Sequence, residues 1–95
     1  MVVQLTAADF EPHIGTDFDV AEIPAPLALQ LLEVRQLGTA LRGGGAFALT
    51  FRGPLAEPLQ QATYPLVHPR LGRLDVFIVP IARQNDGMRY EAVFT

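Results

Sequence analysis

The hydrophobic and polar residues in the last third of the chain alternate in two runs that predict a β-hairpin. Residues 74–81 form the first run and residues 88–95 the second, and the polar segment 83–87 between them ends in Asp-Gly. Asp-Gly between runs of β-branched and aromatic residues is a strong local hairpin signal, because glycine adopts a positive φ without strain. We therefore predict a hairpin with Asp86 and Gly87 as its two turn residues.

That turn determines a register and a core face. It predicts three cross-strand pairs, which are Arg83 with Tyr90, Ile81 with Ala92, and Val79 with Phe94. The core side is then expected to be nearly all apolar and to carry Phe77, Val79, Ile81, Tyr90, Ala92 and Phe94. The run 76–79 is apolar on both faces, which predicts a central strand covered on each side. Pro80 cannot donate to a ladder and is expected at a bulge or at the end of the pairing.

A short helix is predicted near the N-terminus. Thr6 is a helix-capping residue, and Asp9 three residues later can reach back to it. Pro12 limits the helix to one or two turns. We expect this helix to close one end of a sheet or barrel with Phe10 and Ile14.

Two further strands are predicted in the first half of the chain. Residues 17–23 alternate, with Phe18 and Val20 inward, and prolines follow. Segment 27–37 carries leucines on both parities, so we favour a strand with a bulge near Leu31 and Leu32. A helix is the alternative there, since Leu, Ala, Gln and Glu are good helix formers.

The middle of the chain predicts two more strands. Segment 46–52 alternates with period two and directs Phe47, Leu49 and Phe51 inward. Segment 64–68 is a short strand that a four-residue turn, 69–72, connects to the final hairpin. With that turn, Val67 is predicted to face Leu74 and Tyr64 to face Phe77.

About six short strands with local connections and one N-terminal helix predict a mainly β fold. We expect a small antiparallel barrel or roll, with a sandwich as the alternative. The 95 residues are expected to form a single domain, 1–95.

Composition narrows the classes of function. The chain has no Cys, Ser, Lys or Trp, which removes Ser and Cys nucleophiles, thiolate metal sites, lysine chemistry and disulfides. A net charge of −3 with seven scattered Arg gives no basic stripe for nucleic acid. No apolar run reaches the length of a membrane span and no secretion signal is visible, so a soluble, cytoplasmic protein without membrane contact is expected.

The residues that might carry chemistry are few. His13 and His68 each have a neighbouring proline, which is typical of turns, so a structural or solvent-facing role is expected for both. Asp17 and Asp19 share one strand face but lack the further ligands that calcium needs, and are expected to be solvated. The glycines 43–45 precede a strand, so they are interpreted as a flexible linker and not as a phosphate loop. We therefore predict no catalytic residue, no cofactor and no metal.

Surface pairs are predicted around the final hairpin, with Arg83 stacked on Tyr90 and Arg89 beside Glu91. If the last strand is a sheet edge, its free backbone groups would receive another chain. The candidate interface residues on this basis are Arg83, Arg89, Glu91, Val93 and Thr95.

The second half of the chain resembles an uncharacterised family of small bacterial β domains. The residues that carry the resemblance are F-x-L-x-F-R-G-P at 47–54, T-Y-x-L-x-H-P-x-L-G at 63–72, L-x-x-F-x-V-P at 74–80 and D-G-x-x-Y-E-A-V-F at 86–94. The family brings no established activity. An association of such domains with genes for phage-tail-collar-like proteins implies a role in an assembly.

Three functions follow as expectations. The favoured one is a non-enzymatic structural or adaptor domain whose partner is another protein or a second copy of itself. A barrel that binds a small molecule in an apolar interior is the alternative. An acid-base enzyme that uses His68 or His13 with a carboxylate such as Asp75 is the least favoured.

Overall fold

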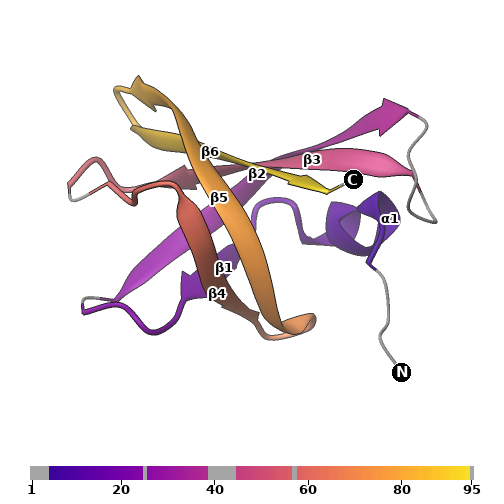
Figure 1. Cartoon of the computed structure of the whole chain (residues 1–95), viewed down its shortest axis with the longest axis horizontal. Coiled ribbons are helices and arrows are strands. Elements are labelled where there is room, and N and C mark those ends of the chain that lie inside the picture. The colour runs from indigo at the N-terminus through magenta and orange to yellow at the C-terminus, as the bar shows by residue number, and fades with distance from the viewer. Residues whose placement is uncertain (1–4, 25, 39–44, 57, 95) are drawn as a thin grey trace.

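The computed structural model describes residues 5–24, 26–38, 45–56 and 58–94. Its elements in chain order are α1 (Ala7–Phe10), the 3-10 helix η1 (Glu11–His13), β1 (Asp17–Val20), β2 (Leu27–Gly38), β3 (Ala46–Gly53), β4 (Ala62–His68), β5 (Gly72–Gln84) and β6 (Gly87–Phe94). All neighbouring strands are antiparallel, and they close into a barrel in the order β1-β2-β3-β6-β5-β4 (Figure 1). The prediction of a mainly β barrel of six strands with one short helix is confirmed.

The N-terminal helix covers one end of the barrel, beside the end of β6 (Figure 1). The Asp9 carboxylate accepts the Thr6 backbone N–H at 2.7 Å, as the capping prediction required. Phe10 is fully buried, with its ring 5.7 Å from that of Phe47 on β3. Ile14 is 46% exposed, so its predicted role in closing the barrel is wrong, because η1 ends at His13 and the chain turns there towards β1.

The first two strands follow the sequence pattern closely. Phe18 and Val20 are buried as predicted, but β1 ends at Val20, and Glu22 beyond it has a positive φ of 61°. The register between β2 and β3 shifts between Leu31 and Glu33, which confirms the bulge and shows that the helical alternative for this segment is wrong. The bulge explains why the leucines of β2 occupy both parities.

The hairpin of β4 and β5 differs by one residue from the prediction. His68 pairs with Gly72, so the connection has three residues, 69–71, instead of four. Tyr64 consequently faces Val76 and not Phe77. Gly72 has a φ of 76°, a left-handed conformation in which it can still begin the strand.

The final hairpin is also shifted. Gln84 pairs with Gly87, so Asn85 and Asp86 form the turn, and Arg83 faces Met88. The register shifts between Pro80 and Ala82, which confirms the bulge expected at Pro80. The predicted pairs Arg83 with Tyr90, Ile81 with Ala92 and Val79 with Phe94 are therefore wrong.

The shift reverses the two faces of β5. Val76 and Ile78 point into the barrel, whereas Phe77 and Ile81 are each 50% exposed. The core side of β6 is as predicted, since Tyr90 and Ala92 are buried and Phe94 packs against the core. The prediction that the run 76–79 is covered on both sides is therefore wrong for the outer side, where Phe77 is half exposed. The pattern misled because a strand that is apolar on both faces carries no alternation from which to choose the inner one.

A close approach of two strands explains why residue 87 is a glycine, which its position next to the turn did not reveal. A Cβ at this position would lie 2.4 Å from the backbone oxygen of Gly53 on β3. Only glycine lets the two backbones approach so closely. The β5–β6 turn is therefore held against the end of β3 by the absence of a side chain.

Side chains of every strand fill the barrel interior. The largest fully buried ones are Tyr90, Phe10, Phe18, Phe47, Phe51, Leu29, Leu31, Leu49, Leu66 and Ile78. The inward row of β3 is as predicted. The wall of the barrel is a single sheet, and β6 stands between β3, which pairs with its residues 88–94, and β5, which pairs with its residues 87–91, so β6 is not an edge strand over residues 88–91.

Candidate functional site

The outer surface of β5 and β6 carries four apolar side chains, Phe77, Val79, Ile81 and Val93, which we call the outer stripe. Phe77 and Ile81 are 50% exposed and Val93 is 49% exposed, while Val79 is half-buried. Val79 faces Glu91 at the end of the β5–β6 pairing, and Phe77 and Val93 lie beyond that end on the two strands. Phe77, Ile81 and Val93 are thus three large apolar side chains that solvent reaches on the outer side of two neighbouring strands, and exposed apolar residues of this kind can mark a contact surface.

Charged residues flank the outer stripe. Asp75 lies two residues before Phe77, and its carboxylate is 3.9 Å from Arg73. Arg83 lies near the other end of β5 and is exposed, but beyond the register shift it faces Met88, on the side of the strand opposite the outer stripe. Beside Val79, Glu91 forms an ion pair with Arg35 of β2 at 3.3 Å.

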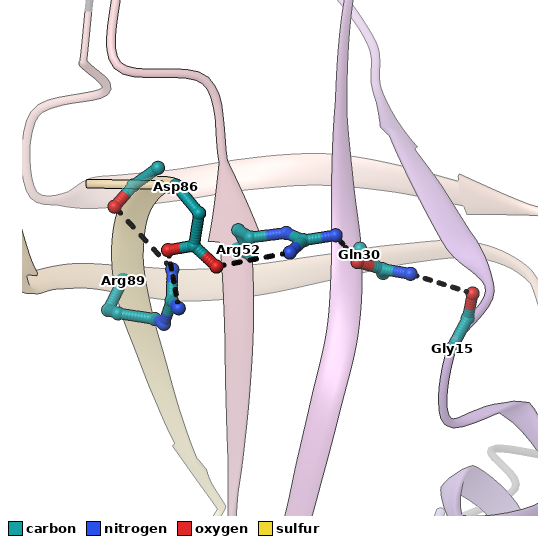
Figure 2. Close-up of polar contacts among 6 residues, drawn as sticks. Gly15, Gln30, Arg52, Asp86 and Arg89 are labelled. Atoms are coloured by element: carbon teal, nitrogen blue, oxygen red, sulfur yellow. Dashed lines mark hydrogen bonds and ion pairs between the residues drawn. The ribbon is translucent and has the colours of Figure 1, made fainter. Parts of the chain in front are cut away.

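A polar row crosses the neighbouring wall of the barrel. Its members Asp17, Gln30, Arg52 and Arg89 are successive cross-strand partners on β1, β2, β3 and β6, and we call them the polar belt. Figure 2 shows Arg52 between Gln30 and Asp86, donating to both. Arg89 donates to the same Asp86 at 2.8 Å, and Gln30 donates to the Gly15 carbonyl at 3.2 Å.

These contacts define the electrostatics of the polar belt. The hydrogen bond from Arg89 lowers the pKa of Asp86 below its usual value, and the hydrogen bond from Arg52 adds to this. An open hollow of about 620 Å³ lies over the row. Because Arg52 and Arg89 share one carboxylate and Arg52 also binds Gln30, the belt ties three strands and the Gly15 turn together, and we assign it a structural role.

His13 and His68 meet at the end of the barrel near α1, although they are far apart in the sequence. Their ring centroids are 4.6 Å apart, and His68 is only 3% exposed. His68 Nδ1 accepts the backbone N–H groups of Arg70 at 3.0 Å and Leu71 at 3.3 Å. Its Nε2 lies 3.0 Å from the hydroxyl of Thr16, which donates to the His13 carbonyl at 2.6 Å.

This network determines the protonation state of His68. Because Nδ1 accepts two N–H groups and the Thr16 hydroxyl already donates elsewhere, the ring is neutral with its proton on Nε2. Burial lowers the pKa of His68, and the nearby His13 and Arg70 lower it further. Both ring nitrogens are engaged, so the structural role expected for His68 fits its contacts.

The carboxylates predicted to be solvated are exposed. Asp17 and Asp19 line an open hollow of about 520 Å³ together with both histidines, whereas Asp75 is not among the residues that line it. Among the residues that the structure describes, no three His, Cys, Asp or Glu side chains come together as metal ligands would. Of the glycines 43–45 that were interpreted as a linker, 43 and 44 lie outside the described residues.

An apolar groove lies where the β1–β2 and β3–β4 connections meet. It measures about 580 Å³ and is lined mainly by prolines and aliphatic residues, together with Tyr64. Beneath this region the buried hydroxyl of Tyr90 accepts the Leu59 backbone N–H at 2.9 Å. Burial raises the pKa of Tyr90 above its usual value, although that hydrogen bond acts in the opposite direction.

The predicted interface residues have different surroundings. Arg89 has only 13% of its side chain exposed and binds Asp86, and Glu91 binds Arg35, so the predicted pair of Arg89 with Glu91 is absent. Stacking of Arg83 on Tyr90 is wrong because Tyr90 points into the barrel. Val93 belongs to the outer stripe, whereas Arg83 faces Met88 on the other side of β5. Thr95 lies outside the described residues.

The residues of β5 in the outer stripe were missed as surface residues. Their apolar character was visible in the sequence, but the assumed turn assigned them to the core. The signal that finds them is the apolar run on both faces, because a barrel of one sheet can bury only one face of a strand.

None of the helices in the part of the chain that the structure describes is long and apolar enough to cross a membrane.

Comparison with known proteins identifies the family to which the chain belongs. No curated protein sequence matches the chain significantly, and no solved structure does. Residues 5–94 match the family model described as a domain of unknown function, DUF6916. Since this match spans nearly the whole sequence, the chain belongs to the DUF6916 family.

Proposed function

We propose that this protein is a non-enzymatic structural or adaptor domain that works by protein–protein contact through the outer stripe. The observation that carries the proposal is the exposure of Phe77, Ile81 and Val93 on one wall of a barrel whose interior is already filled. Exposed apolar patches of this kind commonly become buried against a partner protein, and aromatic side chains are enriched at the centre of such interfaces.

The mode of contact follows from the closed ring. Over residues 88–91, β6 pairs with β3 on one side and β5 on the other, so its backbone groups there are used within the barrel and a partner meets side chains instead of adding a strand. The assembly we propose is a phage-tail-like or surface assembly, which is the role that the resemblance of the second half of the chain implies.

The other candidate functions have less support. A small-molecule site inside the barrel would need an open interior, and the core side chains occupy it. Acid-base chemistry at His68 would need a free ring nitrogen close to a carboxylate. Its nitrogens are engaged with Arg70, Leu71 and Thr16.

Site-specific photo-crosslinking in the native host tests the proposal. A photoreactive phenylalanine analogue replaces Phe77 in one variant and Val93 in another, and the exposed Asp19 on the β1 wall carries it in the matched control. We expect crosslinked products from positions 77 and 93 and none from 19. Equal yields at all three positions, or none at 77 and 93, would contradict contact through the outer stripe.

A further inference from the structure

We propose that the bond between Asp86 and Gly87 is a modification site, at which Asp86 rearranges to isoaspartate, and that Arg52 and Arg89 hold this reaction back. The inference goes beyond the proposed protein contact and does not depend on it. It follows from the chemistry of an Asp-Gly sequence and from the two arginines that bind the Asp86 carboxylate.

The chemistry of this rearrangement selects one position in the chain. The backbone nitrogen of the residue that follows an aspartate attacks the side-chain carboxyl carbon, and a bulky following side chain hinders that attack. Four aspartates precede Phe or Val, in the pairs Asp9-Phe10, Asp17-Phe18, Asp19-Val20 and Asp75-Val76. Asp86 alone precedes glycine, which has no Cβ to hinder its nitrogen.

The reaction has two balanced steps. In the first, the Gly87 nitrogen bonds to Asp86 Cγ and gives up its proton, while the protonated carboxyl loses a hydroxyl. One water leaves, and a five-membered succinimide ring remains. In the second step, water opens the ring. Opening at Cγ restores aspartate, whereas opening at the backbone carbonyl gives isoaspartate, whose main chain runs through Cβ and Cγ.

The fold itself requires glycine at position 87. Gly87 is buried, and a Cβ there would lie 2.4 Å from the backbone oxygen of Gly53. A residue with a side chain, which would hinder the attack, therefore does not fit between β6 and β3. Because the glycine cannot be exchanged, protection has to come from the surroundings of Asp86.

Two arginines bind the two oxygens of the Asp86 carboxylate. Arg89 donates to Oδ1 at 2.8 Å and Arg52 to Oδ2 at 3.3 Å, and Figure 2 shows the carboxylate between their guanidinium groups. The succinimide ring carries no carboxylate, so both ion pairs are lost when it forms. The carboxyl must also be protonated to lose a hydroxyl, and the hydrogen bonds from Arg89 and Arg52 lower the pKa of Asp86. Both effects slow the first step.

The backbone of the turn opposes ring formation as well. Asn85 and Asp86 form a two-residue turn that is closed by the pair of Gln84 and Gly87. In such turns the N–H of the last residue commonly donates to the carbonyl of the first. Ring formation consumes the Gly87 N–H, so the turn has to open first, and only the open fraction of the molecules reacts.

The product would change the polar belt. Isoaspartate adds one carbon atom to the backbone of the β5–β6 turn and carries its free carboxylate directly on Cα. That carboxylate lacks the Cβ through which Asp86 reaches Arg52 and Arg89 together. The two arginines therefore lose the acceptor that they share.

Peptide mapping of the purified full chain tests the proposal. The chain is kept at pH 5 for several weeks, either folded in buffer or unfolded in guanidinium chloride, and is then digested with trypsin, which releases residues 84–89 as one peptide. Chromatography separates its isoaspartyl form, which has an unchanged mass, and the succinimide is lighter by one water. We expect Asp86 to rearrange at least about tenfold faster in the unfolded chain, because only open molecules react in the folded one.

Single variants assign the protection to the two arginines. Arg52→Gln and Arg89→Gln are each expected to raise the rate in the folded chain about two- to fivefold, as for ion pairs to an exposed carboxylate. Arg35→Gln is the matched control, because Arg35 binds Glu91 instead of Asp86, and it is expected to leave the rate unchanged. Asp86→Glu keeps the charge but closes only a larger ring, and is expected to give no product.

The outcomes decide the site and its protection separately. An unfolded chain without isoaspartate at position 86 would overturn the site. Equal rates in the folded and unfolded wild type would overturn the protection, as would folded Arg52→Gln and Arg89→Gln chains that rearrange no faster than the wild type. Circular dichroism verifies that each variant is folded, and where one is not, the comparison of folded with unfolded wild type still decides.

Discussion

The two faces of β5 are almost equally apolar, but one lies in the barrel interior and the other faces solvent. Val76 and Ile78 are buried against the aromatic core, whereas Phe77 and Ile81, of similar hydrophobicity, are half exposed. The difference comes from the barrel, whose single sheet has one interior. Hydrophobicity alone therefore does not place a side chain in the core, and the outer apolar row is the observation on which the proposed protein contact rests.

The largest predicted effect on the free energy of unfolding is a difference between two neighbouring residues of β5, Ile78 and Phe77. Ile78→Ala is expected to lower the free energy of unfolding by about 2–5 kcal/mol, because it leaves a cavity in a filled core. Phe77→Ser next to it is expected to change the free energy by less than about 1 kcal/mol in dilute solution. Denaturant unfolding at low micromolar concentration measures both, and equal losses would show that the two faces do not differ.

A smaller effect is expected at Gly53, whose backbone φ is ordinary but whose inner side is crowded. An added Cβ would lie 2.9 Å from Leu29 Cδ2 and 2.9 Å from Tyr90 Cε2. Gly53→Ala should therefore cost about 1–3 kcal/mol through overpacking. Thr50→Ala on the same strand is the control for the outer face and is expected to be nearly neutral. If both variants unfold at the wild-type midpoint, the interior is looser than its burial indicates.

Removal of one buried hydroxyl is expected to have a smaller effect again. Tyr90→Phe deletes the acceptor of the Leu59 N–H and should cost about 1 kcal/mol. Tyr64→Phe removes a hydroxyl that donates to the Gln60 carbonyl at an exposed position, and should cost less. Thermal unfolding of the pair compares them, and a larger loss for Tyr64→Phe would contradict the importance assigned to the inner hydroxyl.

The smallest predicted effect is a pH dependence of the stability of the fold, caused by the buried residue His68. Because the pKa of His68 is lowered in the folded chain, the unfolded chain binds the proton more readily. Stability should be greatest above the unfolded pKa of about 6.5 and fall as the pH drops through it, levelling off below the folded pKa.

Two variants identify the histidine responsible for that slope. His68→Gln should flatten the slope between pH 7.5 and pH 5, whereas His13→Gln should retain most of it. Unfolding by urea at a series of pH values gives both slopes, and an unchanged slope in His68→Gln would rule out His68 as its source.

Much of the architecture was predictable from the sequence because local patterns agreed with it. The inward row of Phe47, Leu49 and Phe51 and the bulge near Leu31 follow from period-two alternation and its interruption. The strand registers were harder to predict from the sequence. Each depended on the placement of a turn to within one residue, and Asn85-Asp86 and Asp86-Gly87 are chemically similar candidates for the last turn.

The candidate site was predictable only in part. Val93 was predicted as an interface residue and lies in the outer stripe, but Phe77 and Ile81 were assigned to the core, because the turn error exchanged the faces of β5. The His13–His68 contact depends on ring closure between β1 and β4, which no local pattern specifies. Sequence reasoning therefore placed one member of the outer stripe on the surface and missed the others.

The position of β6 in the ring has a consequence for how the chain folds. β6 is the last strand in sequence order, yet it stands between β3 and β5, and its pairing joins Phe47 to Phe94. Until β6 has been synthesised, β3 and β5 each expose a pairing edge, and a nascent chain that pauses there is at risk of aggregation. Such long-range pairings make ring closure slow compared with hairpin formation, so this closure is the step at which a chaperone would matter most.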